Sequence, residues 1–288
     1  MALCPYSSSF HQLFWTETRM QCDALKRCVT YLSQKTSSPH VYMIKGMEED
    51  VMNRDLNIYR SNAQVLDRAS CAFLNPSSLG YELPDPEHGV PEFAIVGRSN
   101  VGKSTLLGAL INNPALVKTS KRPGCTKSIN YFGIFNRLPS DPRGTVSVTP
   151  KFYLVDLPGY GFAKAAKKEV HQWQRTMEDF LLSRPPDILR RVYVLIDGRH
   201  GLKLNDNEMM RKLDESGVPY QLVLTKTDLV KSQKGLRLTV EDMYQSLLQN
   251  RNGACMPIVH LVSSKNGFGI QEMKGTICTT AKETRDNI

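Results

Sequence analysis

The chain has 288 residues, of which 41% are hydrophobic and 23% are charged, so it can bury a packed core. No apolar run approaches the roughly 18 residues that a membrane-spanning helix needs, which argues against a membrane span. The seven cysteines are scattered without a C-x-x-C pair, which argues against a structural zinc site and indicates a reducing compartment.

The net charge of +9 is unevenly distributed. Residues 1–90 hold 8 Lys and Arg against 10 Asp and Glu, whereas residues 91–288 hold 29 against 18. Basic surfaces favour polyanions such as RNA or ribosomes. The alternative is a merely soluble surface on a domain that also binds a small anionic ligand.

Residues 1–46 carry five basic and two acidic residues among many Ser and Thr, a composition similar to an organellar transit peptide. Residues 48–90 contain acidic patches, and Pro84, Pro86 and Pro91 mark a linker. An ordinary disordered or partly helical tail is the alternative for this whole extension. We therefore divide the chain into an extension over 1–90, a main domain over 91–282 and a short tail over 283–288.

From residue 91 onward, strand and helix patterns alternate. The strands are predicted at Phe93–Val96, Ile129–Phe135, Phe152–Val155, Val192–Ile196, Tyr220–Leu224 and Ile258–Val262. The helices are predicted near 103–112, 165–182, 205–215, 236–250 and 268–282. This alternation predicts a doubly wound α/β fold with a six-stranded, mostly parallel sheet, whose ligands bind at the carboxyl ends of the strands. The proline-rich segment 137–150 is predicted as a loop.

The stretch from Gly97 to Ser104 reads GRSNVGKS and fits the G-x-x-x-x-G-K-S/T phosphate loop. It lies between the first predicted strand and a helical run, as its chemistry requires. Its backbone N–H groups would surround phosphate oxygens, Lys103 would reach the β- and γ-phosphates, and the Ser104 hydroxyl would bind Mg²⁺. The helix N-terminus adds partial positive charge.

Two further loops are suited to a γ-phosphate and its metal. Asp156 follows a strand and can hold a water bound to Mg²⁺, and Gly159 can offer its N–H to the γ-phosphate. Thr126, in the loop Pro123-Gly124-Cys125-Thr126, can close over Mg²⁺ when the γ-phosphate is present. Such a loop would order with GTP and relax after hydrolysis, which makes it a switch.

The run Thr225-Lys226-Thr227-Asp228 follows another strand and is suited to guanine. The Asp228 carboxylate can accept both the N1–H and the exocyclic amine of guanine, whereas adenine would leave it unpaired. The Lys226 stem can lie across the base plane. Backbone N–H groups of Ser263-Ser264-Lys265, after the last strand, could meet the guanine carbonyl oxygen.

Together these residues resemble the translation-factor class of P-loop GTPases and, more narrowly, the EngB (YihA) family of ribosome-assembly GTPases. The resemblance covers about 91–282. It is carried by GRSNVGKS at 97–104, RPGCTKSINYF at 122–132, DLPGYGFA at 156–163, LIDGRHGLKLND at 195–206, TKTD at 225–228 and SSKNGFGI at 263–270. It implies a monomeric G domain that binds GTP and GDP with Mg²⁺, hydrolyses GTP and serves large ribosomal subunit maturation, with a link to cell division and septation in bacteria.

The resemblance also assigns the site residue by residue. It makes Ser104 and Thr126 the Mg²⁺ ligands, with Asp156 acting through water. The residues it implies for the nucleotide are Gly97, Arg98, Ser99, Asn100, Val101, Gly102, Lys103, Ser104, Gly124, Cys125, Thr126, Lys127, Ser128, Asp156, Leu157, Pro158, Gly159, Thr225, Lys226, Thr227, Asp228, Val262, Ser263 and Ser264.

The chain departs from the family's pattern in two places. The segment 137–150 is an insertion, and the long extension is absent from bacterial members. The extension suits a eukaryotic organellar version, with the mitochondrial matrix as the favoured location and a plastid or the cytoplasm as alternatives.

Tyr160 stands where many small GTPases have a glutamine that positions the attacking water. We therefore expect slow intrinsic hydrolysis that relies on Lys103, Thr126, Gly159 and Mg²⁺. Asn100 could hold a K⁺ ion near the phosphates, as in potassium-activated relatives, or simply face solvent; a ribosomal partner could instead complete the site.

Lys164, Lys167 and Lys168 could contact rRNA phosphates, or form an ordinary solvated helix face. Two other classes of function stay open. One is a GTP-gated scaffold with negligible hydrolysis; the other is a P-loop ATPase, against which Asp228 argues.

Overall fold

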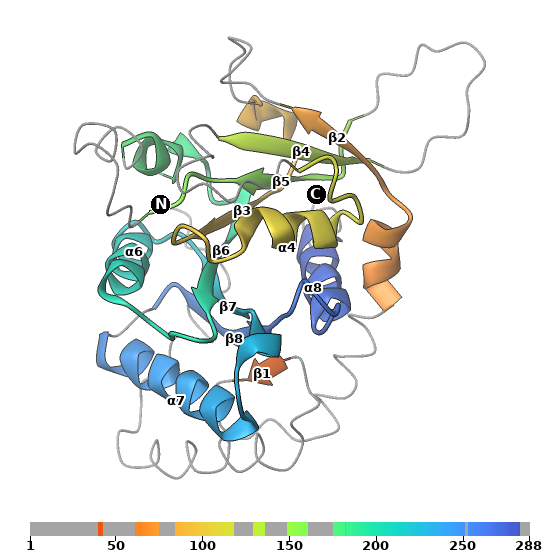
Figure 1. Cartoon of the computed structure of the whole chain (residues 1–288). Coiled ribbons are helices and arrows are strands. Elements are labelled where there is room, and N and C mark those ends of the chain that lie inside the picture. Colours follow the sequence, from red (N-terminus) through yellow and green to blue (C-terminus); the bar gives the residue numbers. More distant parts are fainter. Residues whose placement is uncertain are drawn as a thin grey trace, which may run out of the picture.

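A mixed β-sheet is the centre of the structure, a computed structural model that describes residues 40–42, 61–74, 84–117, 129–135, 149–160, 175–181, 183–250 and 253–282. Among these residues the sheet has eight strands in the order β1-β8-β7-β6-β3-β5-β4-β2 (Figure 1). Five neighbouring strands are parallel: β8 (Cys255–Leu261), β7 (Tyr220–Thr225), β6 (Leu189–Asp197), β3 (Glu92–Gly97) and β5 (Phe152–Asp156). The predicted doubly wound, mostly parallel fold is confirmed.

The sheet is wider than the predicted six strands because both edges gain an antiparallel strand from residues 1–90. β4 (Asn130–Phe135) pairs antiparallel with β5, and β2 (Ser70–Leu74) pairs antiparallel with β4. At the other edge, the three-residue β1 (His40–Tyr42) pairs antiparallel with β8. The described part of the extension therefore contributes directly to the sheet.

Helices cover both faces of the sheet and enclose two apolar cores. One core lies under α4 (Lys103–Leu110), α8 (Ile270–Lys282) and a helix over 61–67; the other lies under α6 (Leu204–Glu215), α7 (Gln233–Asn250) and a helix over 175–181. β3 contributes side chains to both cores. Phe93 and Ile95 lie in the first core, and Ala94 and Val96 lie in the second. The alternation follows from the two-residue period of a strand.

The helix over 61–67 is held to the main domain by a buried lysine. Lys274 of α8 is 1% exposed, and its Nζ lies 2.7 Å from Asp67 Oδ1 and 2.7 Å from Asn112 Oδ1. Leu66 packs into the core beneath α4 and α8. Residues 61–74, which the proline and acidic patches suggested to be linker, thus pack as part of the domain.

A second buried ion pair lies at the amino end of β3, opposite the phosphate loop. Arg184 makes a bidentate contact with Glu92 at 2.7 and 3.1 Å, and it also donates to the Tyr131 hydroxyl and to the Pro84 carbonyl. These bonds join β3, β4 and the segment that enters β3. They fix the base of the sheet from which the site loops project.

Several predictions lie outside the described residues. These are the loop residues Gly124, Cys125, Thr126, Lys127 and Ser128, most of the 137–150 insertion, the lysines at 164, 167 and 168, and most of the extension. None of the helices that the structure describes has the length and hydrophobicity of a membrane-spanning segment.

Candidate nucleotide site

Four of the predicted loops meet at one edge of the sheet. They follow the carboxyl ends of β3, β5, β7 and β8, which are parallel and therefore end on the same side. This is the edge where open α/β sheets bind ligands. Contacts between the loops, described below, make them one assembly.

The phosphate loop curls tightly between β3 and α4. Asn100 and Gly102 have positive φ angles of 62° and 109°, and Gly102 is the N-cap of α4. Lys103 is buried, and its Nζ donates to the Gly97 carbonyl at 3.2 Å, so the lysine folds back over its own loop. Burial lowers the pKa of Lys103, and the charge of Asp156 opposes that effect.

The loop after β5 lies directly against this lysine. A Cβ added to Gly159 would stand 2.8 Å from Lys103 Nζ, so only glycine fits there without displacing the ammonium group. The backbone of the next residue runs along the phosphate loop: Ser99 N donates to the Tyr160 carbonyl at 3.2 Å, and Tyr160 N approaches the Gly97 carbonyl at 3.4 Å. The Gly159 backbone is therefore fixed beside the lysine predicted to meet the γ-phosphate.

Asp156 has the properties expected of a residue that holds a metal-bound water. Its side chain is buried, and among the described residues no hydrogen-bond donor reaches its Oδ1. Burial raises the pKa of Asp156 to about 6, against the opposing charge of Lys103. A buried carboxylate oxygen without a partner is costly, and an ordered water on a cation would supply the missing donor. The residues present thus fit Mg²⁺, and Ser104, the predicted direct ligand, lies in the first turn of α4.

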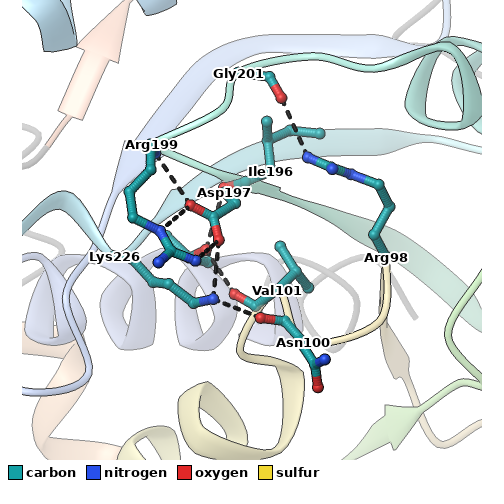
Figure 2. Close-up of polar contacts among 9 residues, drawn as sticks. Arg98, Asn100, Val101, Ile196, Asp197, Arg199, Gly201 and Lys226 are labelled. Atoms are coloured by element: carbon teal, nitrogen blue, oxygen red, sulfur yellow. Dashed lines mark hydrogen bonds and ion pairs between the residues drawn. The ribbon is translucent and has the colours of Figure 1, made fainter. Parts of the chain in front are cut away.

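The base-reading loop is bonded to the phosphate loop through two successive carbonyls (Figure 2). Thr225 Oγ1 lies 2.8 Å from the Val101 carbonyl, and Lys226 Nζ donates to the Asn100 carbonyl. Lys226 itself has a positive φ of 56°, which turns its stem back toward the phosphate loop. The two loops are therefore joined into one unit by contacts within the protein itself.

A carboxylate without a predicted role holds Lys226 in place. Asp197, at the end of β6, lies 2.9 Å from Lys226 Nζ, and Arg199 binds it in a bidentate contact at 2.9 and 2.7 Å (Figure 2). Burial alone would raise the pKa of Asp197, but the hydrogen bonds from Arg199 and Lys226 hold it well below its usual range. The sequence signal that could have identified Asp197 is its position directly after the predicted strand Val192–Ile196. In the sheet this strand, β6, lies between β3 and β7.

Asp228, the residue predicted to select guanine, is exposed, and a buried serine orients it. Ser263 Oγ donates to Asp228 Oδ1 at 2.7 Å, and Thr227 N donates to the Val262 carbonyl at 3.3 Å. Asp228 is therefore held by one oxygen while its side chain stays accessible to a ligand. Loops 225–228 and 262–264 therefore form one wall of the site.

Some residues of the predicted set support the loops rather than face a ligand with their side chains. Val101, Leu157 and Val262 are buried in the two cores. Thr225 is buried too, and its hydroxyl contacts the carbonyls of Val101 and Ile196. For these four positions, a direct contact with a nucleotide would have to come from the backbone.

The Tyr160 side chain lies in the core beside α6. Its hydroxyl donates to Asp206 Oδ1 at 2.8 Å, and its ring is buried. Burial, together with the charge of Asp206, raises the pKa of Tyr160 well above its usual value. This side chain cannot orient a water at the phosphates from that position.

Comparison with known proteins gives concordant results. A family model described as 50S ribosome-binding GTPase matches residues 92–226. The chain is 42% identical over 196 residues to a probable GTP-binding protein EngB of Mesorhizobium japonicum, covering 68% of this chain and 88% of that relative. It is 43% identical over 192 residues to the corresponding protein of Sinorhizobium medicae, covering 67% of this chain and 84% of that relative.

A solved structure supports the fold. A variant of Aquifex aeolicus Era bound to GDP and AlF₄⁻ aligns with a TM-score of 0.50 at 21% identity, covering 66% of this chain and 56% of that one. The shared fold is that of a P-loop GTPase domain.

Proposed function

The chain belongs to the EngB family of GTP-binding proteins, and on that premise we propose that it acts as a GTP-dependent switch on the large ribosomal subunit during assembly. One observation carries the proposal: a loop suited to guanine and a loop suited to the γ-phosphate are both bonded to the same phosphate loop. The ribosomal partner is supported by the description of the matching family model and by the basic excess of residues 91–288.

Guanine would be recognised by the carboxylate of Asp228, which can accept both donors of the base edge. Lys226, held by Asp197, would lie across the base, and the phosphate loop would surround the phosphates. Ser104 and Asp156 would hold Mg²⁺, with Thr126 joining them from the loop outside the described residues. When bound, the ion neutralises charge on the phosphates.

Hydrolysis is expected to be slow without a partner. Phosphoryl transfer depends on positioning and charge stabilisation, which Lys103 and the Gly159 N–H would supply. The Tyr160 hydroxyl is already bonded to Asp206, so this chain presents no water-orienting side chain at that position. A ribosomal particle that completes the site would raise the rate.

The buried Tyr160 also favours a second candidate, a GTP-gated scaffold with negligible hydrolysis. Multiple-turnover GTP hydrolysis, measured with and without large-subunit particles, separates the two. A switch predicts a low basal rate that the particles raise at least about tenfold. A rate indistinguishable from zero in both conditions would support the scaffold.

We also propose that the protein works in the mitochondrial matrix. The support is the basic, Ser- and Thr-rich composition of residues 1–46. Because β1 (His40–Tyr42) pairs with β8 and residues 61–74 pack into the main domain, the fusion that tests this should carry residues 1–39 on a fluorescent reporter. Mitochondrial import of the reporter is expected; a plastid or diffuse cytoplasmic signal would contradict the location.

A further inference from the structure

A buried carboxylate at the start of α6 links two of the nucleotide loops. Asp206 is 0% exposed and accepts from the Tyr160 hydroxyl at 2.8 Å, from Arg98 Nε at 3.0–3.1 Å and from Lys203 N at 2.9 Å. Arg98 belongs to the phosphate loop, and Tyr160 directly follows Gly159. A buried charge is tolerated only when it is paired and fully hydrogen-bonded, and these donors meet that condition.

The phosphate-loop side of this network is firmly placed. Besides its ion pair with Asp206, Arg98 donates through Nη2 to the Gly201 carbonyl at 3.2 Å (Figure 2). Arg98 and Tyr160 also form a parallel β-bridge through their backbones. Tyr160 is thus joined to the phosphate loop at two points: its backbone pairs with Arg98 directly, and its hydroxyl is linked to Arg98 through Asp206.

The position of Tyr160 determines the position of Gly159. Gly159 has no side chain to anchor it, and its backbone has only a narrow space beside Lys103. On its C-terminal side, Gly159 is anchored by Tyr160, whose ring packs in the core and whose hydroxyl is held by Asp206. A donor that is already in place loses less conformational entropy when a ligand binds.

We propose that Asp206 is a positioning residue that, through Tyr160, presets the Gly159 N–H for the γ-phosphate and thereby raises the affinity for GTP relative to the affinity for GDP. The inference rests on the nucleotide switch proposed above, since it concerns how that switch senses its ligand. GDP lacks the γ-phosphate, so its binding does not use the Gly159 N–H. The Tyr160–Asp206 bond therefore contributes to the affinity for GTP and leaves the affinity for GDP unaffected, whereas the Arg98–Asp206 pair supports a loop that both nucleotides use.

The test is Tyr160→Phe, which removes one hydroxyl and keeps the ring. Affinities of the full-length protein for fluorescent GDP and for a fluorescent non-hydrolysable GTP analogue are measured by titration in Mg²⁺. Loss of one charge-assisted hydrogen bond predicts an affinity for the analogue about tenfold lower, with the affinity for GDP changed less than about twofold.

The chain offers a matched control in Tyr220→Phe. The Tyr220 hydroxyl donates to Asp214 Oδ2 at 3.1 Å, which is the same kind of bond near the other end of α6. Its loss should lower the unfolding temperature without altering the ratio of the two affinities. Asp206→Asn, alone and combined with Tyr160→Phe, gives a double-mutant cycle that should show coupling in the analogue affinity only.

If Tyr160→Phe leaves the ratio of the affinities for the GTP analogue and for GDP unchanged, whether or not both fall, the inference is overturned and the proposed function still stands. Wild-type protein that binds neither guanine nucleotide would overturn both. A ratio that shifts equally in Tyr220→Phe would show a general effect of stability and would also count against the positioning role.

Discussion

Lys226 Nζ lies 2.9 Å from a carboxylate oxygen of Asp197, and the same ammonium group donates to the Asn100 carbonyl of the phosphate loop. The lysine is therefore fixed between two loops by contacts within the protein itself. Asp197 is in turn fixed by the bidentate contact with Arg199. This preorganisation lowers the ordering cost of binding for any guanine nucleotide, whatever its number of phosphates.

Asp197→Ala tests that relationship. Without the carboxylate, Lys226 loses its ion pair, and the affinities for GDP and for a GTP analogue should both fall about tenfold, because a charge-assisted bond is lost. Titration with fluorescent nucleotides measures both. Glu215→Ala, which breaks the exposed Arg211–Glu215 pair on α6, is the control and should change neither. Affinities within twofold of wild type would show that Lys226 does not need Asp197.

Asp228→Asn tests base selection. The asparagine retains an acceptor for Ser263 but cannot accept both donors of guanine, so the affinity for GDP should fall at least about 100-fold. Xanthine carries an oxygen where guanine has its amine, and the asparagine amide can donate to that oxygen. The affinity of the variant for xanthosine diphosphate (XDP) should therefore rise above its affinity for GDP. Competition between the two nucleotides measures the change. An unchanged preference for GDP would remove Asp228 from the base-binding site, and preferential binding of ATP by the wild type would favour the ATPase alternative.

Asp67→Ala tests whether the helix over 61–67 is part of the stable domain. The change leaves Lys274 buried without its carboxylate partner, so the free energy of unfolding should fall by about 2–4 kcal/mol. Urea denaturation measures the loss, with Glu215→Ala again as the exposed-pair control. A loss below about 0.5 kcal/mol would show that the helix is dispensable.

The same contact predicts a dependence on pH. Burial alone would raise the pKa of Asp67, but the hydrogen bonds from Lys274 and Asn112 bring it below its ordinary value of 3.8. The native state therefore binds this proton less tightly than the unfolded chain does. The stabilisation is present above pH 3.8 and is lost as the pH falls through the native pKa. Asp67→Asn should flatten that part of the acid unfolding curve.

Asn100 provides a test of monovalent-cation activation. The backbone carbonyl of Asn100 accepts a hydrogen bond from Lys226, whereas its side chain is exposed and points away from Asp197 (Figure 2). If the amide helps to hold K⁺ near the phosphates, replacing Na⁺ by K⁺ should raise GTP turnover several-fold, and Asn100→Ala should abolish the difference. Equal wild-type turnover in the two salts would leave Asn100 as a solvent-facing residue.

The parts of the fold that could be predicted are those with a local signal. The strand β3 and the phosphate loop follow from an apolar run and a fixed spacing, and Asp228 follows from its motif after β7. The strand β2 has a weak pattern because only Cys71 and Ala72 of its five residues are even half-buried. It is stabilised by pairing with β4, a strand that is distant in the sequence, so the local pattern of residues does not predict it.

The unpredicted part of the site depends on contacts between distant residues. Arg98 and Asp206 are 108 positions apart, and the contact appears only when α6 packs beside the phosphate loop. Asp197 and Lys226 come from the ends of neighbouring strands. Residue types alone gave no reason to pair Asp197 with Lys226. The loops could therefore be predicted from their motifs, but the contacts between the loops could not.

Cosedimentation with large ribosomal subunits tests whether the protein is a GTP-dependent switch on the large subunit. Full-length protein is mixed with the particles in GDP or in a non-hydrolysable GTP analogue, both with Mg²⁺. For such a switch, the analogue should retain the protein on the particles and GDP should release it. Equal cosedimentation in the two nucleotides, or none in either, would contradict a GTP-dependent switch on the large subunit.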